Sequence, residues 1–88
     1  MEPDFFYVYV LRSLADRMFY VGYTRGLRQR FCQHQSGEVP STRERLPVEL
    51  VYYEACRRST DATRREKYLK SAWGKRFLKS RIRDYLTG

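Results

Sequence analysis

A run of eight residues near the start of the chain, Phe5 to Arg12 (FFYVYVLR), is the strongest constraint on the fold. Aromatic and β-branched side chains dominate this run, which favours a β-strand. Successive strand residues point to opposite faces, and here both faces are apolar. Because neither face can lie against water, we expect the strand at the centre of a sheet, with helices or loops covering both sides.

Two further segments have strand character: Phe19 to Thr24 (FYVGYT) and Val48 to Ala55 (VELVYYEA). Ser13 to Asp16 supply turn residues and predict a four-residue loop between the first two strands, which would form a hairpin with Tyr9 opposite Tyr20. A cross-strand aromatic pair that only stabilises the sheet is the alternative interpretation of these tyrosines.

Helical periodicity is found in the rest of the chain, over about residues 27–36, 59–71 and 75–86. Gly37 offers the left-handed residue that ends the first helix, and Ser59 to Asp61 offer the N-cap of the second. Trp73 and Gly74 are interpreted as the break before the third helix. Residues 38–47 contain two prolines and are interpreted as a loop.

The expected order, β-β-α-β-α-α, describes an α+β fold in which a three-stranded antiparallel sheet is flanked by helices. A chain of 88 residues is long enough for one domain, expected to span residues 1–88. It has neither an apolar run of membrane-spanning length nor a signal-peptide pattern, so we expect no membrane partner. Cys32 and Cys56 lack disulfide or metal spacing, which favours a reducing compartment, the cytoplasm.

Charge narrows the class of partner. The net charge of +8 favours a polyanion, nucleic acid first, over a small-molecule substrate. From Arg57 onward there are eleven Lys and Arg residues against three acidic residues. A solvated helical surface is the alternative interpretation of this basic region.

The second predicted strand and the helix after it carry side chains suited to phosphate chemistry. Tyr20, Gly22 and Thr24 share one face of the strand. Arg30 and His34 are four residues apart and therefore share one face of the helix. A chance Arg/His pair on an amphipathic helix is the alternative.

Glu66 is the most informative residue outside that region. It lies on the apolar line of the second predicted helix, together with Ala62, Leu69 and Trp73. A carboxylate on a line that faces the core is costly unless it is paired or binds a metal ion. On spacing alone, a buried salt bridge to an arginine is the favoured explanation.

Together these residues resemble the pattern of GIY-YIG nuclease domains, above all their short stand-alone bacterial members. In that pattern G-I-Y is followed after about ten residues by Y-[IV]-G, then by an arginine, by a histidine or tyrosine four residues later, and by a glutamate on the helix after the third strand. The resemblance runs from Phe5 to about Leu86, and the matching residues are Tyr9, Tyr20, Gly22, Arg30, His34 and Glu66.

Three places depart from this pattern. Tyr7 stands at the position of the first glycine, and Arg25-Gly26-Leu27 stand where an Asp-Leu pair often opens the helix. Leu78 stands where larger members carry an asparagine. The missing asparagine leaves a catalytically weak or inactive module that binds DNA or RNA as the alternative to a nuclease.

The resemblance implies a metal-dependent DNA endonuclease, acting in DNA repair, recombination or processing. Its implied catalytic residues are Tyr9, Tyr20, Arg30, His34 and Glu66, with Glu66 as the ligand of one Mg²⁺ or Mn²⁺ ion. Arg30 matches two phosphate oxygens, and a tyrosine takes a proton from water, with His34 as a candidate relay. The sequence does not choose between the two tyrosines, and the resemblance favours Tyr20.

A second set of residues is expected to contact the substrate. Gly22 would leave room for a phosphate to approach the strand, and arginines in the predicted loop would reach the phosphate backbone. The full set is Tyr7, Gly22, Thr24, Arg43, Arg45, Lys75, Arg76 and Lys79.

Overall fold

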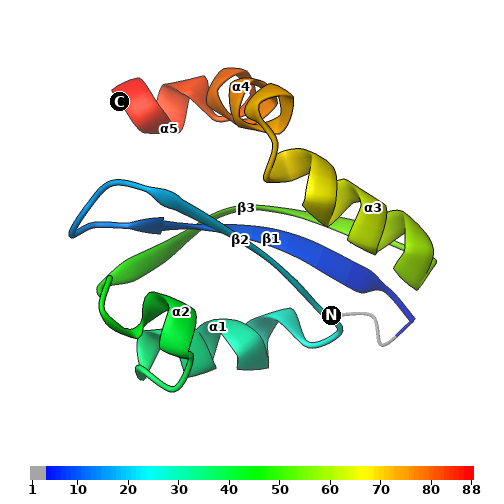
Figure 1. The fold of residues 1–88 in the computed structure, drawn as a ribbon, viewed down its shortest axis with the longest axis horizontal. Helices are drawn as coiled ribbons and strands as arrows, with labels where there is room; N and C mark the ends of the chain where they lie inside the picture. The colour runs from blue at the N-terminus through cyan, green and yellow to red at the C-terminus, as the bar shows by residue number, and fades with distance from the viewer. Residues whose placement is uncertain (1–3) are drawn as a thin grey trace.

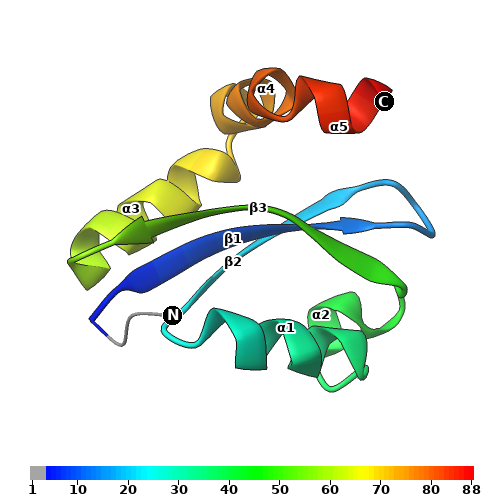
Figure 2. The same cartoon turned by 180° about the vertical axis from the view of Figure 1, so that it is seen from behind.

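A three-stranded antiparallel sheet separates two helical layers in the computed structural model, which describes residues 4–88 (Figure 1). The strands are β1 (Phe6–Ser13), β2 (Phe19–Thr24) and β3 (Val48–Cys56), in the order β2-β1-β3. On one side of the sheet lie α1 (Leu27–Gln35) and α2 (Pro40–Arg43). On the other lie α3 (Ser59–Leu69), α4 (Ala72–Arg81) and α5 (Arg83–Thr87), as Figure 2 also shows. The predicted α+β class is confirmed.

β1 is the central strand, as its two apolar faces predict. Val8 and Val10 are fully buried on the side of α3 and α4, where they join a cluster with Leu69. Tyr9 and Leu11 are buried on the opposite side, in a cluster that includes Leu27 of α1 and therefore faces the first helical layer. One strand thus supplies the core of both layers.

The hairpin register differs from the prediction by two residues. Tyr9 pairs with Gly22, and Tyr20 pairs with Leu11. The turn has the predicted four residues but lies one residue further along the chain, at residues 14–17, because Ser13 stays in β1. The Ser13 hydroxyl accepts hydrogen bonds from two amides of the turn. A shift of two residues keeps Tyr9 and Tyr20 on the same face, as diagonal neighbours with ring centroids 6.4 Å apart.

α1 ends as predicted, whereas the segment after it is not all loop. Gly37 has a φ of +81°, and its N–H donates to the His34 carbonyl, while the Glu38 N–H donates to the Gln33 carbonyl. The loop prediction is wrong for Pro40–Arg43, which form α2. Pro40 occupies the first turn of that helix, where a missing N–H removes no helical hydrogen bond.

The predicted helix boundaries after β3 also need correction. α3 begins after Arg58, without a side-chain cap from Ser59 to Asp61, and it ends at Leu69. The cap belongs to α4, where the Ser71 hydroxyl accepts a hydrogen bond from the Gly74 N–H. Trp73 therefore lies on α4, where it is 68% exposed, and it does not continue the buried line of Glu66.

Gly74 is not a helix break. It lies inside α4, and a Cβ at this position would stand 2.0 Å from the carbonyl oxygen of Tyr68 in α3. The glycine therefore allows α4 to turn closely against the end of α3. The third predicted helix instead breaks near its end, at Ile82, which separates α4 from α5. None of the described helices is long and apolar enough to cross a membrane.

Candidate active site

Three side chains from three different elements form a buried hydrogen-bonded chain. The Tyr9 hydroxyl lies 2.8 Å from His34 Nε2, and His34 Nδ1 lies 2.7 Å from the Thr42 hydroxyl. Tyr9 is 1% exposed, and His34 and Thr42 are fully buried. Sequence reasoning missed Thr42 because α2 was interpreted as a loop, and no motif spacing links this residue to His34.

Gly22 provides the space that Tyr9 occupies. A Cβ at Gly22 would stand 2.3 Å from both Cζ and the hydroxyl oxygen of Tyr9. Such a contact requires the ring to move, so only glycine permits this position of the phenol. In the structure, the ring of Tyr9 fills the space that the absence of a side chain at Gly22 leaves on the strand.

Tyr20 also faces His34 but differs from Tyr9 in its exposure. Its ring centroid lies 5.1 Å from that of His34, compared with 5.6 Å for Tyr9. Tyr20 is half-buried and lines a small hollow at the edge of β2, together with Lys70 and Lys75. The structure thus brings both predicted tyrosines to His34, one inside the protein and one at its surface.

Arg30 and burial set the electrostatics of this chain. Burial raises the pKa of Tyr9, and the charges of Tyr20 and Glu66 raise it further, while a hydrogen bond and the positive charge of Arg30 lower it. Burial and the Arg30 charge lower the pKa of His34 to about 4. His34 is therefore neutral at pH 7, and one of its ring nitrogens accepts a hydrogen bond.

Glu66 lies close enough for its charge to act on Tyr9. The expected buried salt bridge to an arginine is wrong for this residue, because its partner is Lys70 at 3.3 Å in a partly exposed pair. The arginine pair forms elsewhere: Arg65 donates to both oxygens of Glu54, at 2.8 and 2.9 Å. Glu66 itself is 23% exposed, so its carboxylate is accessible to a ligand.

A divalent metal ion would have Glu66 as its protein ligand. Residues 4–88 contain no group of three or more His, Cys, Asp or Glu side chains that could hold a metal ion. Mg²⁺ nevertheless fits one carboxylate, because it usually keeps several waters and takes further oxygens from a substrate phosphate. The structure therefore fits an ion that binds together with its substrate.

The remaining predicted contact residues are spread over the molecule. Tyr7 is buried against Tyr53, and Arg45 donates to Asp16 at 3.0 Å, so neither offers a free surface to a substrate. The Thr24 hydroxyl accepts a hydrogen bond from the Gly26 N–H before α1.

Arg43 is exposed on α2. The other three predicted contact residues lie on α4. Lys75 and Lys79 are exposed, and the Arg76 guanidinium lies over the Trp73 ring.

We expect the buried imidazole to make the protein sensitive to mild acid. The folded-state pKa of His34, about 4, lies below the ordinary 6.5, so between these values the unfolded chain binds more protons. The free energy of unfolding is then highest above pH 6.5 and falls with pH by up to about 1.4 kcal/mol per unit, or about 3 kcal/mol in all. Urea denaturation at pH 7.0, 6.0 and 5.0 measures this slope.

His34→Gln is the control for this slope. Glutamine retains hydrogen-bonding groups but does not titrate, so the variant should be less stable at pH 7 and lose much less stability between pH 6.5 and 5. Aspartate and glutamate side chains titrate mainly below that window. Parallel stability curves for the parent and the variant would show that His34 is not the group responsible.

Comparison with known proteins agrees with this arrangement. The model of the GIY-YIG catalytic domain matches residues 5–81. A UPF0213 protein of Natronomonas pharaonis is 46% identical over 66 residues, covering 74% of this chain and 76% of its own. A UPF0213 protein of Pediococcus acidilactici is 43% identical over 77 residues, which cover 84% of this chain and 78% of that protein.

A solved structure shows the same family. The solution NMR structure of a UPF0213 protein from Bacillus halodurans superposes with a TM-score of 0.55 and 35% identity, over 86% of this chain and 83% of that one. The family match spans all three strands and α1 to α4, including every residue of the candidate site. This chain belongs to the GIY-YIG family of nuclease domains.

Proposed function

We propose that the protein is a metal-dependent DNA endonuclease that hydrolyses a phosphodiester bond next to Tyr9, in DNA repair, recombination or processing in the cytoplasm. One observation carries the proposal: the buried Tyr9 hydroxyl is hydrogen-bonded to a neutral histidine, and the charges of both Arg30 and Glu66 act on it. A cross-strand aromatic pair that only stabilised a sheet would need neither the histidine nor these charges.

Tyr9 is the better candidate for the general base. A phenol whose pKa is raised by burial is almost fully protonated at pH 7, so it needs a group that accepts its proton. His34 Nε2, 2.8 Å away, takes that role when the other ring nitrogen carries the hydrogen and donates it to Thr42. Tyr9 can then remove a proton from water while it passes its own to His34.

His34 resists protonation in the free protein, because burial and Arg30 hold its pKa at about 4. An anionic phosphate bound beside the site favours the imidazolium and so assists the transfer. The relay is therefore expected to operate with substrate bound and to stay idle without it.

Arg30 and Glu66 have separate tasks. The planar guanidinium of Arg30 can donate two parallel hydrogen bonds to phosphate oxygens, which stabilise the charge that develops during hydrolysis. Glu66 would hold one Mg²⁺ or Mn²⁺ ion, which supplies Lewis-acid stabilisation of the phosphate when it is bound. The partly exposed carboxylate can exchange its contact with Lys70 for the ion, since ion pairs near the surface contribute little stability.

A cleavage assay with tyrosine variants tests the proposal. Labelled single-stranded, duplex, flapped and branched DNA, with an RNA strand for comparison, are incubated with Mg²⁺, Mn²⁺ or EDTA. We expect DNA products only with a metal ion. Tyr9→Phe should lower the rate by about 10²-fold or more, which is the usual contribution of acid–base catalysis. Tyr20→Phe, the matched control on the same face, should retain activity within about tenfold.

Three results would contradict this assignment. Binding of DNA that never yields metal-dependent products would support the alternative of an inactive binding module. Preferential action on RNA would support an RNA-processing role. A greater loss with Tyr20→Phe than with Tyr9→Phe would transfer the role of the base to Tyr20.

A further inference from the structure

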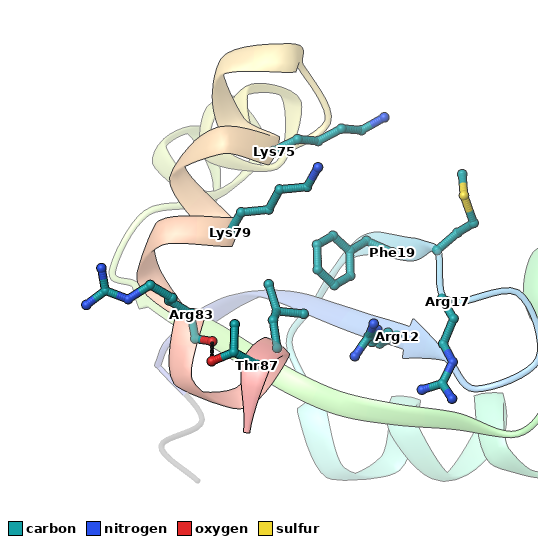
Figure 3. Close-up of a pocket in the computed structure, with 9 residues that line it drawn as sticks. Arg12, Arg17, Phe19, Lys75, Lys79, Arg83 and Thr87 are labelled. Carbon is teal, nitrogen blue, oxygen red and sulfur yellow. Dashed lines mark hydrogen bonds between the residues drawn. The ribbon is translucent and has the colours of Figure 1, made fainter.

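A larger groove lies on the other side of the sheet, between α4–α5 and the end of the β1–β2 hairpin (Figure 3). Its volume is about 620 Å³, within the range of sites that hold a small ligand. The residues that line it are Arg12, Arg17, Met18, Phe19, Lys75, Lys79, Arg83, Leu86 and Thr87. Only Lys75 and Lys79 of this set were expected to bind a substrate, and the groove unites them with residues from the hairpin.

The charge of the groove is entirely positive. Lys75, Lys79 and Arg83 follow one another at intervals of four residues along α4 and into α5; Lys75 and Lys79 extend toward the hairpin that carries Arg12 and Arg17, whereas the Arg83 side chain points away from it (Figure 3). No carboxylate lines the groove, and none of the five cations forms an ion pair with another of residues 4–88. Such a row of unneutralised cations fits a chain of phosphates better than a single anion.

Arg12 has an unused hydrogen-bond donor. Its guanidinium lies over the ring of Tyr85, and its Nε is buried without a hydrogen-bond partner in the described part of the chain. A buried donor of this kind is costly unless a ligand satisfies it. This donor belongs to a residue that also lines the groove.

Between the cations the groove is apolar. The ring of Phe19 points into it from β2, opposite Lys79, and the side chains of Met18 and Leu86 extend the apolar surface. Met18 is 59% exposed. Cations around a partly exposed aromatic ring such as Phe19 are features of proteins that hold a single nucleic-acid strand, whose free bases stack on the ring. A duplex keeps its bases stacked on one another and would leave this surface uncovered.

The groove adjoins the small hollow at the edge of β2. Phe19 and Lys75 also line the small hollow at the β2 edge, which contains Tyr20 and Lys70. Lys70 in turn pairs with Glu66. A strand that passes the reaction site can therefore continue along β2 into the groove.

We propose that this groove binds an unpaired segment of the nucleic-acid substrate, adjacent to the phosphate that is cleaved. DNA with a single-stranded segment beside the cleavage point is then the preferred substrate, rather than uninterrupted duplex. The position of the bound segment relative to the cleaved bond rests on the proposed nuclease function, whereas the binding of a single strand by the groove does not.

Binding without cleavage tests the groove directly. Fluorescence anisotropy in EDTA measures the affinity for a labelled ten-nucleotide single strand, a duplex of the same length and a peptide of ten glutamates. We expect the single strand to bind most tightly. The double variant Lys75→Ala/Lys79→Ala should lose about tenfold in affinity, and its log–log salt slope should fall by about 1.4, at about 0.7 per phosphate contact.

Arg58→Ala/Arg64→Ala is the matched control, because it removes two exposed cations of the α3 region that do not line the groove. It should change the single-strand affinity less than about threefold. Phe19→Leu tests stacking. Leucine is also apolar, so we expect a melting curve near that of the parent. The affinity for the single strand should fall roughly tenfold, and the affinity for the other two ligands should not change.

Equal losses in the groove and control variants, tighter binding of the duplex, or equal binding of the glutamate peptide would each overturn the proposal. The nuclease proposal fails separately. A parent protein that binds single strands through the groove but never cleaves with Mg²⁺ or Mn²⁺ would remove the catalytic function and leave the groove assignment standing. Metal-dependent cleavage by the parent, together with groove variants that bind single strands like the parent, would support the nuclease function and overturn the groove assignment.

Discussion

Glu66→Gln is expected to abolish metal-dependent cleavage, by about 10³-fold or more, while the domain stays folded. Glutamine keeps the shape of the side chain but lacks the negative charge that a divalent ion requires. Residues 4–88 contain no group of three or more His, Cys, Asp or Glu side chains that could hold the ion in its place. Single-turnover cleavage with Mg²⁺ and with Mn²⁺ measures the loss.

The structure also predicts that this substitution costs little stability. The pair of Glu66 with Lys70 is partly exposed, and pairs of this kind contribute about 0–1 kcal/mol. Asp61→Asn is the control, because it removes a carboxylate that pairs with a cation on the same helix, away from Tyr9. If Glu66→Gln cleaves at the parental rate while Asp61→Asn behaves as expected, Glu66 is not the metal ligand.

The metal dependence of binding gives a second measure of the same role. When Mn²⁺ is titrated into the protein bound to a non-cleavable DNA, the parent should bind an ion. Glu66→Gln should bind Mn²⁺ with much lower affinity. DNA affinity in EDTA should be similar for both proteins, because no ion is then present. Equal Mn²⁺ affinity would place the ion elsewhere.

Arg30→Lys is expected to separate binding from chemistry. Lysine keeps the positive charge and most of the stem, but it lacks the planar fork that donates two parallel hydrogen bonds. DNA affinity should stay within about threefold of the parent, while the cleavage rate at saturating protein should fall by about 10²–10³-fold, as for the loss of one preorganised donor in other enzymes.

Two features of the structure make this loss specific. Arg30 Nη1 donates to Gln33 at 3.1 Å, so the guanidinium is held within the turn that leads to His34. Arg30 also lowers the pKa of Tyr9 by a hydrogen bond and by its charge. A lysine would retain the charge effect and lose the directed donor, so both the phosphate contact and the phenol would be affected.

Arg28→Lys is the matched control, two residues away and exposed on the same helix. Both variants have the net charge of the parent, so non-specific attraction to DNA is unchanged. A binding module without catalysis predicts no gap between affinity and rate for either variant. Parental cleavage by Arg30→Lys at saturating protein would remove Arg30 from the mechanism.

Much of the candidate site could be predicted because its spacing is local. Arg30 and His34 share a helix face at any register of the sheet, since they are separated by one helical turn. Tyr20 and Gly22 share a strand face for the same reason. The central position of β1 follows from its two apolar faces alone, and Gly37 ends α1 through a conformation that glycine adopts readily.

The remainder depends on which distant elements meet. The partner of His34 on its other nitrogen, Thr42, lies on a helix of four residues that carries no periodic signal. The pairing of Arg65 with Glu54 depends on how α3 packs against β3, whereas Glu66 and Lys70 are only one helical turn apart. Pairing rules based on spacing within one helix contain no information about that packing.

The sequence by itself determined the class of fold, the central strand and the set of side chains capable of phosphate chemistry. Only the tertiary structure decided the register that places Tyr9 over Gly22, because Ser13 stays in β1 and moves the turn one residue along the chain. It also decided the basic groove, whose hairpin and α4 residues lie far apart in the chain. Periodicity encodes which face of an element is apolar, whereas register and the angle between packed elements arise from the fit of side chains across the whole core.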